Sequence, residues 1–275
     1  MKAWLDRLSF FDGPGVRWMV RLVAGNERIA FGLFGFVAIS VLWEVASNTG
    51  LFRKSLLSSP TLIWKAATTD FGSGVIWEHI NTSLTEFGLG FLLALVIGIP
   101  LGLLIGMFRR VDYLASVLLS GIYATPKVAL APLIIIVAGI GLEAKLIIVF
   151  LSTVFALVVS TVGGVHSVAA RHLEITRSFG ASRWLVFHSV VLPSTLPFML
   201  TGVRIGAGRA LVGVIAAEFL AANVGIGFYI SLYGSLIDTS RVMLGIVLLG
   251  VFGVAIGELI RIIEMRFEVW RPEIR

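Results

Sequence analysis

Long uninterrupted blocks of apolar residues constrain this sequence more than any other feature. A helix that crosses a bilayer needs about 20 mostly apolar residues, and several blocks reach that length. Inside a bilayer only helices and closed barrels satisfy the backbone hydrogen bonds, and blocks this continuous indicate helices. We therefore predict an all-α integral membrane protein with six transmembrane helices, at residues 29–47, 83–107, 113–140, 144–162, 196–221 and 242–262.

The charge content agrees with a membrane protein. Charged residues make up 14% of the 275 residues, whereas soluble domains usually carry about 25%. The formal net charge is +6, but the basic residues stand at the ends of apolar blocks and are not interleaved with aromatic residues. We therefore predict contact with membrane lipid and no nucleic-acid binding. Cysteine is absent, which excludes disulfides and cysteine nucleophiles.

The basic residues also predict the orientation of the chain. They gather in both terminal tails and in the connections after the second and fourth blocks, which share one side if there are six spans. The positive-inside bias makes that side, and both termini, cytoplasmic. We therefore expect an N-terminal cytoplasmic or interfacial segment at 1–28, a membrane domain at 29–262 and a cytoplasmic tail at 263–275. Charges and Pro14 interrupt residues 1–28, so we predict no cleavable signal peptide.

Glycine repeats predict close packing of two of the helices. Gly98, Gly102 and Gly106 recur every four residues in the second block, and Gly202 and Gly206 do so in the fifth. This spacing lets helix backbones approach each other closely.

The connection at 171–193 carries the most informative pattern. Apolar and charged residues alternate at helical spacing, and Gly180 divides the segment into two short pieces. We expect a helix, a bend at Gly180, and a second helix that ends at Pro193, because proline cannot continue a helix interior. Such a helix can transmit rigid-body movement from a soluble partner.

The residues of this connection resemble the signature of permease subunits of binding-protein-dependent ATP-binding-cassette importers. The signature reads Glu-Ala-Ala, three residues, Gly, nine residues, Ile, one residue, Leu-Pro. The chain matches it at Glu174, Gly180, Leu192 and Pro193, and departs from it at Ile175, Thr176 and Val190. Supporting segments favour the nitrate/sulfonate/taurine branch of these permeases, at 57–61, 98–102, 131–133, 180–184, 200–205 and 217–219.

The resemblance implies a complex in the bacterial cytoplasmic (inner) membrane. It would contain two copies of this chain, two ATP-binding-cassette ATPase subunits and an extracytoplasmic substrate-binding protein. ATP and Mg²⁺ would bind to the ATPases, so no cofactor is expected on this chain. The loop at 171–193 would act as a cytoplasmic coupling helix, and its expected ATPase-coupling residues are Glu174, Arg177, Gly180, Ala181, Ser182 and Arg183.

Ionisable residues inside spans are costly, so they face protein or water and mark candidate pathways. Lys127 follows Pro126 in an interrupted block, and interrupted helices often line substrate cavities. Lys127 and Arg209 would favour a small organic or inorganic anion, such as a sulfonate, taurine, nitrate or a carboxylate. The alternative is that each cation pairs with a carboxylate and stabilises the bundle. The candidate pathway residues are Lys127, Arg209, Tyr123 and Glu218.

No catalytic constellation is apparent in the sequence. It has no GxxxxGK[ST] phosphate loop, no nucleophile elbow and no histidine spacing typical of a metal site. We therefore expect no enzyme and no metal on this chain. A secondary transporter driven by an ion gradient is the alternative function; it would explain six spans but not the 171–193 pattern. A membrane-embedded enzyme would need converging catalytic groups within the spans.

Overall fold

The computed structural model describes residues 27–49 and 58–267, which fall into two compact units, 1–65 and 66–275. Residues 1–26 of the predicted N-terminal segment and residues 268–275 of the predicted tail lie outside the described residues. In the first unit, α3 (Glu27–Asn48) is followed by the start of α4 (Pro60–Ser73). The indole of Trp43 donates to the carbonyl of Ser58 at 2.8 Å, and Glu44 accepts from the Thr61 hydroxyl at 2.8 Å.

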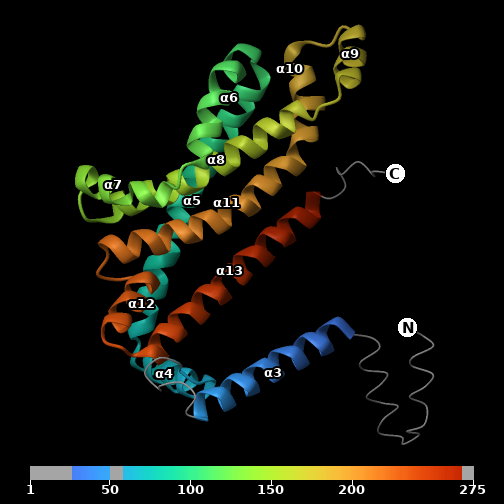
Figure 1. The fold of residues 1–275 in the computed structure, drawn as a ribbon. Coiled ribbons are helices and arrows are strands. Elements are labelled where there is room, and N and C mark those ends of the chain that lie inside the picture. The colour runs from blue at the N-terminus through green and yellow to red at the C-terminus, as the bar shows by residue number, and fades with distance from the viewer. Residues whose placement is uncertain (1–26, 50–57, 268–275) are drawn as a thin grey trace, which may run out of the picture. The chain divides into compact units, whose positions relative to one another are not determined.

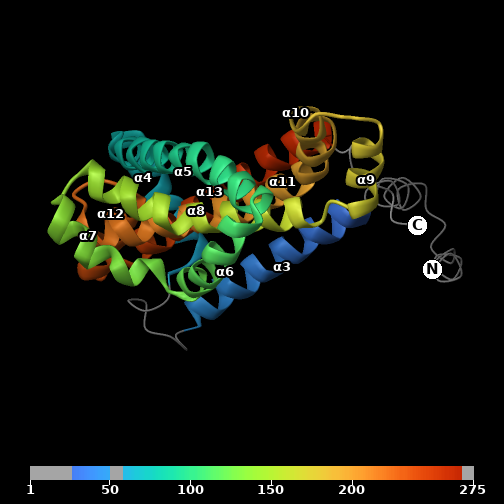
Figure 2. The same ribbon diagram turned by 90° about the horizontal axis from the view of Figure 1, so that it is seen from above.

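Residues 66–267 of the second unit form helices joined by short connections, with no strand among them (Figure 1). Its elements are the end of α4, α5 (Val75–Met107), α6 (Arg109–Ala124), a 3-10 turn η2 (Lys127–Leu130), α7 (Ala131–Ala138), α8 (Leu142–His166), α9 (Ala170–Ser178), α10 (Arg183–Val186), a π-helical turn η3 (Phe187–Val191), α11 (Leu192–Ala221), α12 (Ile226–Ser235) and α13 (Thr239–Phe267). Figures 1 and 2 place α9 and α10 at one end of the long helices, and α7 and α12 at the other.

Helix α8 is the centre of this unit and packs most extensively against α5 and α11. The predicted glycine packing is confirmed. A Cβ atom at Gly102 would lie 2.6 Å from the Cβ of Thr161, and one at Gly202 would lie 2.8 Å from the Cβ of Ser160. Such distances exclude any larger residue without a shift of the helices, so glycine brings the backbones of all three helices together.

The prediction of an all-α protein with six spans is confirmed. Among residues 27–49 and 58–267, five helical segments are long and apolar enough to cross a membrane, and α6 together with η2 and α7 makes a sixth if that bent pair is counted as one span. The bend between its two parts is 83°. It falls at Pro126, as the proline in that block predicted, and it directs Lys127 into a turn between two helices.

Several boundaries differ from those predicted, and two of the differences have a clear physical cause. Helix α5 begins at Val75, eight residues before the predicted start. Its first turns carry several polar residues, of which His79 and Ser83 are buried, and these residues lower the hydropathy there. The prediction that Pro193 ends a helix is wrong: α10, η3 and α11 run on continuously. In the π-helical turn the N–H of Leu192 bonds to the carbonyl of Phe187, five residues back. A proline at this widened turn therefore continues the helix, since the ladder is already interrupted there.

Candidate functional site: a cationic pocket and a bent loop

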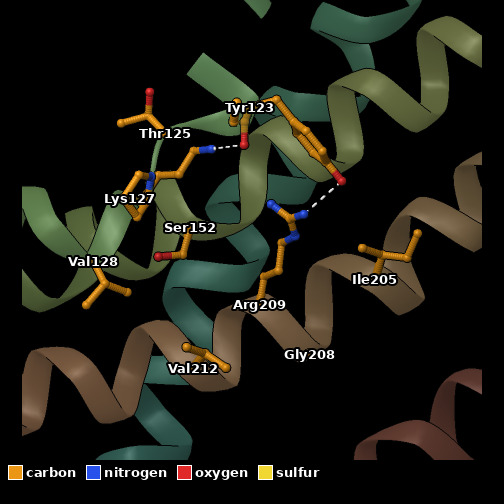
Figure 3. Close-up of a pocket in the computed structure, with 11 residues that line it drawn as sticks. Tyr123, Thr125, Lys127, Val128, Ser152, Ile205, Gly208, Arg209 and Val212 are labelled. Carbon is orange, nitrogen blue, oxygen red and sulfur yellow. Dashed lines mark hydrogen bonds between the residues drawn. The ribbon is translucent and has the colours of Figure 1, made fainter. Parts of the chain in front are cut away.

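A pocket of about 430 Å³ lies where α6, η2, α8 and α11 meet (Figure 3). Its volume is in the range of small-molecule sites. The structure brings three of the four predicted pathway residues together in its wall, namely Tyr123, Lys127 and Arg209. The interruption of the third span makes this possible, because the end of α6 presents Tyr123 and the following turn presents Lys127 to the same space.

Lys127 is held in the wall by the end of the preceding helix. Its ammonium donates to the carbonyl of Tyr123 at 2.7 Å, a carbonyl near the C-terminus of α6. The same nitrogen lies 5.4 Å from the ring centre of Tyr123 and 5.5 Å from that of Phe155. These are cation–π distances, so a carbonyl dipole and two ring faces stabilise the charge.

Arg209 approaches Tyr123 from the opposite wall, on α11. One guanidinium nitrogen donates to the Tyr123 hydroxyl at 2.8 Å, and the guanidinium carbon lies 4.4 Å from the ring centre. Tyr123 therefore bridges the two cations, with its carbonyl on Lys127 and its hydroxyl on Arg209, as Figure 3 shows.

Neither cation has a carboxylate partner within ion-pair distance among residues 27–49 and 58–267. Other cations within the spans do have one: Arg204 pairs with Glu264, and Lys145 pairs with Glu86 at 2.5 Å. The described side chains therefore do not support the alternative of carboxylate pairing for Lys127 and Arg209, whereas Arg204, about which no pairing was predicted, does have a carboxylate partner. The pocket holds positive charge that no described side chain neutralises.

Glu218, the fourth predicted pathway residue, does not line this pocket. It is 1% exposed, and its carboxylate accepts from the Ser83 hydroxyl at 2.5 Å and from the Gly227 N–H at 2.6 Å. A Cβ atom at Gly225 would lie 2.3 Å from the Glu218 carboxyl carbon, so the glycine turn before α12 wraps closely around this side chain. Glu218 is thus placed to hold the first turn of α12 against α5 and α11.

A second polar group, which we call the α12 cluster, consists of Asp70, Tyr229, Asp238 and Arg241. The guanidinium of Arg241 donates to Asp70 through Nε at 2.9 Å and Nη2 at 3.0 Å, and to Asp238 through Nη1 at 2.7 Å. Tyr229 is fully buried and donates to Asp70 at 2.5 Å. Burial by itself would raise the pKa of Asp70, but the hydrogen bonds from Arg241 and Tyr229 outweigh it, and the pKa lies below its usual value.

The 171–193 loop has the predicted bend. Helix α9 ends at Ser178, Gly180 adopts a positive φ of 72°, and α10 begins at Arg183. This left-handed conformation is the one that glycine adopts without strain. Ser182 caps α10 by accepting from the Leu185 N–H at 3.3 Å.

Most of the predicted coupling residues are open to a partner. The side chains of Glu174, Ser182 and Arg183 are exposed, as is Gly180, while Ala181 is partly buried. The side chain of Arg177 is not among those that the structure describes. The loop also exposes large apolar groups, with Phe179 at 87% and Trp184 at 70%. An exposed apolar surface beside charges is typical of an interaction site.

Several pocket residues escaped the sequence prediction. Ser152 of α8 reaches the wall, and α11 supplies Ile205, Gly208 and Val212 beside Arg209. These α11 positions recur at the helical spacing of three and four residues and so share one face. That periodicity, starting from Arg209, was the signal that could have found them; Ser152 has no such signal.

Comparisons with known proteins agree with the fold and identify the family. Residues 98–269 match the family described as "Binding-protein-dependent transport system inner membrane component". The chain is 30% identical to the taurine transport system permease protein TauC of Escherichia coli over 91% of this chain and 93% of that protein. It is 27% identical to the putative aliphatic sulfonates transport permease protein SsuC of Bacillus subtilis, over 92% of each.

A third relative differs in the transported compound that its name states. The formylaminopyrimidine transport permease protein ThiX of Halalkalibacterium halodurans is 30% identical over 86% of this chain and 94% of that protein. Among solved structures, an inward-facing form of the MetNI methionine ABC transporter covers 72% of this chain and 99% of its own, with a TM-score of 0.61 at 17% identity. That likeness supports the fold. The family match covers most of the chain, and the chain therefore belongs to the inner-membrane components of binding-protein-dependent transport systems.

Proposed function

We propose that this permease forms the pathway for a small anion in an ATP-driven importer. Its relatives are named for taurine and aliphatic sulfonates, whose sulfonate groups are anionic at neutral pH, and one is named for formylaminopyrimidine. A sulfonate, taurine, nitrate or carboxylate-like solute fits the positive charge of the pocket. The importer would consist of two copies of this chain, two ATPase subunits that bind ATP and Mg²⁺, and an extracytoplasmic binding protein.

The observation that carries the proposal is the pair of cations without carboxylates. Unneutralised charge inside a membrane protein is costly and marks ion or substrate pathways. Arg209 has five N–H donors in a planar fork, and one is engaged by Tyr123. Its remaining donors and the Lys127 ammonium are available to the oxygens of an anion. Charge-assisted bonds of this kind recognise sulfonate and carboxylate groups through geometry as well as charge.

The loop at 171–193 supports coupling to the ATPases. It presents Glu174 and Arg183 together with exposed aromatic residues, and the continuous helix from α10 into α11 joins it mechanically to Arg209. A shift of the loop would therefore move the pocket wall as one body. Two packings of the bundle, biased by ATP binding and hydrolysis, would open the pathway to either side in turn. In this arrangement the basic termini lie in the cytoplasm.

Uptake by variants of the two cations tests the pathway. The complete complex is reconstituted in liposomes with its binding protein, and uptake of taurine, an alkanesulfonate and nitrate is measured. Lys127→Met and Arg209→Gln each remove one charge, and we expect uptake of the transported anion to fall roughly ten-fold, the effect of one lost charge-assisted bond. Arg204→Gln is the matched control. Arg204 lies on the same helix as Arg209, but it pairs with Glu264 and does not line the pocket.

Basal ATP hydrolysis confirms that each variant assembles. Unchanged uptake in both Lys127→Met and Arg209→Gln would refute the pathway, whereas an equal loss in Arg204→Gln would show that the effect comes from general charge or stability.

Substitution of Gly180 tests the coupling. Gly180→Val strains the left-handed backbone at about 1–2 kcal/mol, while a Cβ atom there meets nothing within 4 Å. We expect substrate-stimulated ATP hydrolysis to separate from uptake in this variant. Gly180→Asn is the matched control, since asparagine tolerates positive φ and should retain more of the coupling. Normal uptake and normal stimulated hydrolysis in Gly180→Val would refute the role of the bend.

A further inference from the structure

Three ionisable side chains from three different helices meet in the interior of the bundle. Glu86 of α5 and Glu218 of α11 are each 1% exposed, and Lys145 of α8 is 8% exposed. The Lys145 ammonium lies 2.5 Å from Glu86 Oε1. Ser83, whose hydroxyl donates to Glu218 at 2.5 Å, lies three residues before Glu86 on α5, so Glu218 packs against the same face of α5 that carries Glu86. This group is separate from the cationic pocket, and neither the anion pathway nor the coupling loop makes use of it.

The hydrogen bonds of the group leave one oxygen without a donor. Glu218 Oε1 accepts from Ser83, Glu218 Oε2 accepts from the Gly227 N–H, and Glu86 Oε1 accepts from Lys145. Glu86 Oε2 is buried and accepts from no donor among the described residues. A buried carboxylate oxygen without a donor loses its hydration and gains nothing in return.

The charges of the group do not balance either. Two ionised carboxylates and one ammonium would leave one negative charge in the interior of a membrane protein, which is expensive. One proton removes that charge, and it also supplies the donor that Glu86 Oε2 lacks. Two carboxyl groups side by side commonly share one proton for this reason.

We propose that Glu86, Glu218 and Lys145 form a buried proton-binding site that holds one proton between the two carboxyl groups at neutral pH. The site is neutral as a whole: one carboxylate balances Lys145, and the other carboxyl is protonated and donates to its neighbour.

The site is joined to the start of α12. Glu218 binds the Gly227 N–H, and the Ser83 hydroxyl that donates to Glu218 also accepts from the Ile226 N–H at 2.8 Å. His79, one turn earlier on α5, accepts from the Gly225 N–H at 3.0 Å through Nδ1. Loss of the proton would place a second negative charge beneath this turn. The proton therefore favours the docking of α12 on α5 and α11, and its loss at alkaline pH weakens this docking.

Infrared spectroscopy of the chain in lipid nanodiscs tests the proposal. The C=O stretch of a protonated carboxylic acid is distinct from the carboxylate bands and shifts in D₂O. We expect one such band at neutral pH, and we expect it to disappear in Glu86→Gln and equally in Glu218→Gln, because in each variant the remaining carboxylate is balanced by Lys145. Glu258→Gln is the control: it removes an exposed carboxylate that pairs with Arg261, and the band should remain.

Absence of the band from the unmodified protein would overturn the proposal, as would a band that survives either Glu86→Gln or Glu218→Gln. Thermal unfolding against pH provides a second readout. The melting temperature of the unmodified chain should fall from neutral to alkaline pH more than that of Glu218→Gln, whose amide cannot ionise. Equal alkaline slopes would count against the proton.

Discussion

The charged side chains of this permease are stabilised in two opposite ways, by carboxylate partners in one set and by neutral groups in the other. In the paired region, Arg241 of the α12 cluster meets Asp70 and Asp238, and Lys145 meets Glu86. In the pocket, Lys127 and Arg209 have only Tyr123 between them, a neutral residue that offers a carbonyl, a ring and a hydroxyl. Paired charges are expected to hold helices together, whereas charges that only neutral groups stabilise keep their attraction for a passing anion. Under the proposed function, the contrast separates residues that stabilise the fold from residues that line the pathway.

The largest expected effect is on the paired side. Lys145→Met leaves Glu86 buried without its cation, and removing one partner of a buried pair costs about 3–5 kcal/mol. The loss is measured by reversible unfolding in mixed micelles. The double variant Glu86→Met with Lys145→Met should recover most of it, because an apolar pair of similar size is often as stable as a buried ion pair. A double variant no more stable than Lys145→Met would break the comparison.

A smaller effect is expected at Asp70. Asp70→Asn weakens two hydrogen bonds from Arg241 but leaves Asp238 as a partner, so we expect a loss of about 2 kcal/mol. The folded pKa of Asp70 lies below its usual value of 3.8, so its ionised form stabilises the protein above that value, and this contribution is lost as pH falls through the folded pKa. The unmodified chain should therefore lose more stability than Asp70→Asn between neutral pH and about pH 3. Parallel acid unfolding curves would contradict this.

The smallest expected effect sharpens the comparison from the pocket side. Tyr123→Phe keeps the ring beneath both cations and removes the hydroxyl that accepts from Arg209. A hydrogen bond to a residue of the pathway is worth about 1 kcal/mol, so we expect a few-fold change in the uptake KM with little change in unfolding. A stability loss as large as that of Asp70→Asn would mean that the pocket, too, is part of the structural framework.

Sequence reasoning was most successful where local chemistry decides the outcome. The six spans, the break at Pro126 and the bend at Gly180 all follow from hydropathy, proline and glycine. The close packing at Gly102 could be predicted because glycines spaced four residues apart lie on one face of a helix. The prediction that Pro193 ends a helix was wrong because the effect of a proline depends on the hydrogen bonds of the preceding turn. The π-helical residues rearrange those hydrogen bonds.

The sequence by itself determined that this protein is a helical membrane permease and that Lys127 and Arg209 are costly enough to matter. Only the tertiary structure decided that both reach one pocket through Tyr123, that Arg204 is neutralised by Glu264, and that Glu218 belongs with Glu86 and Lys145. The physical reason is that the energetic cost of placing a charge in the membrane follows from its position in an apolar block, which the sequence shows. Its compensation comes from helices dozens of residues away, and contact between them exists only once α5, α8 and α11 have packed together.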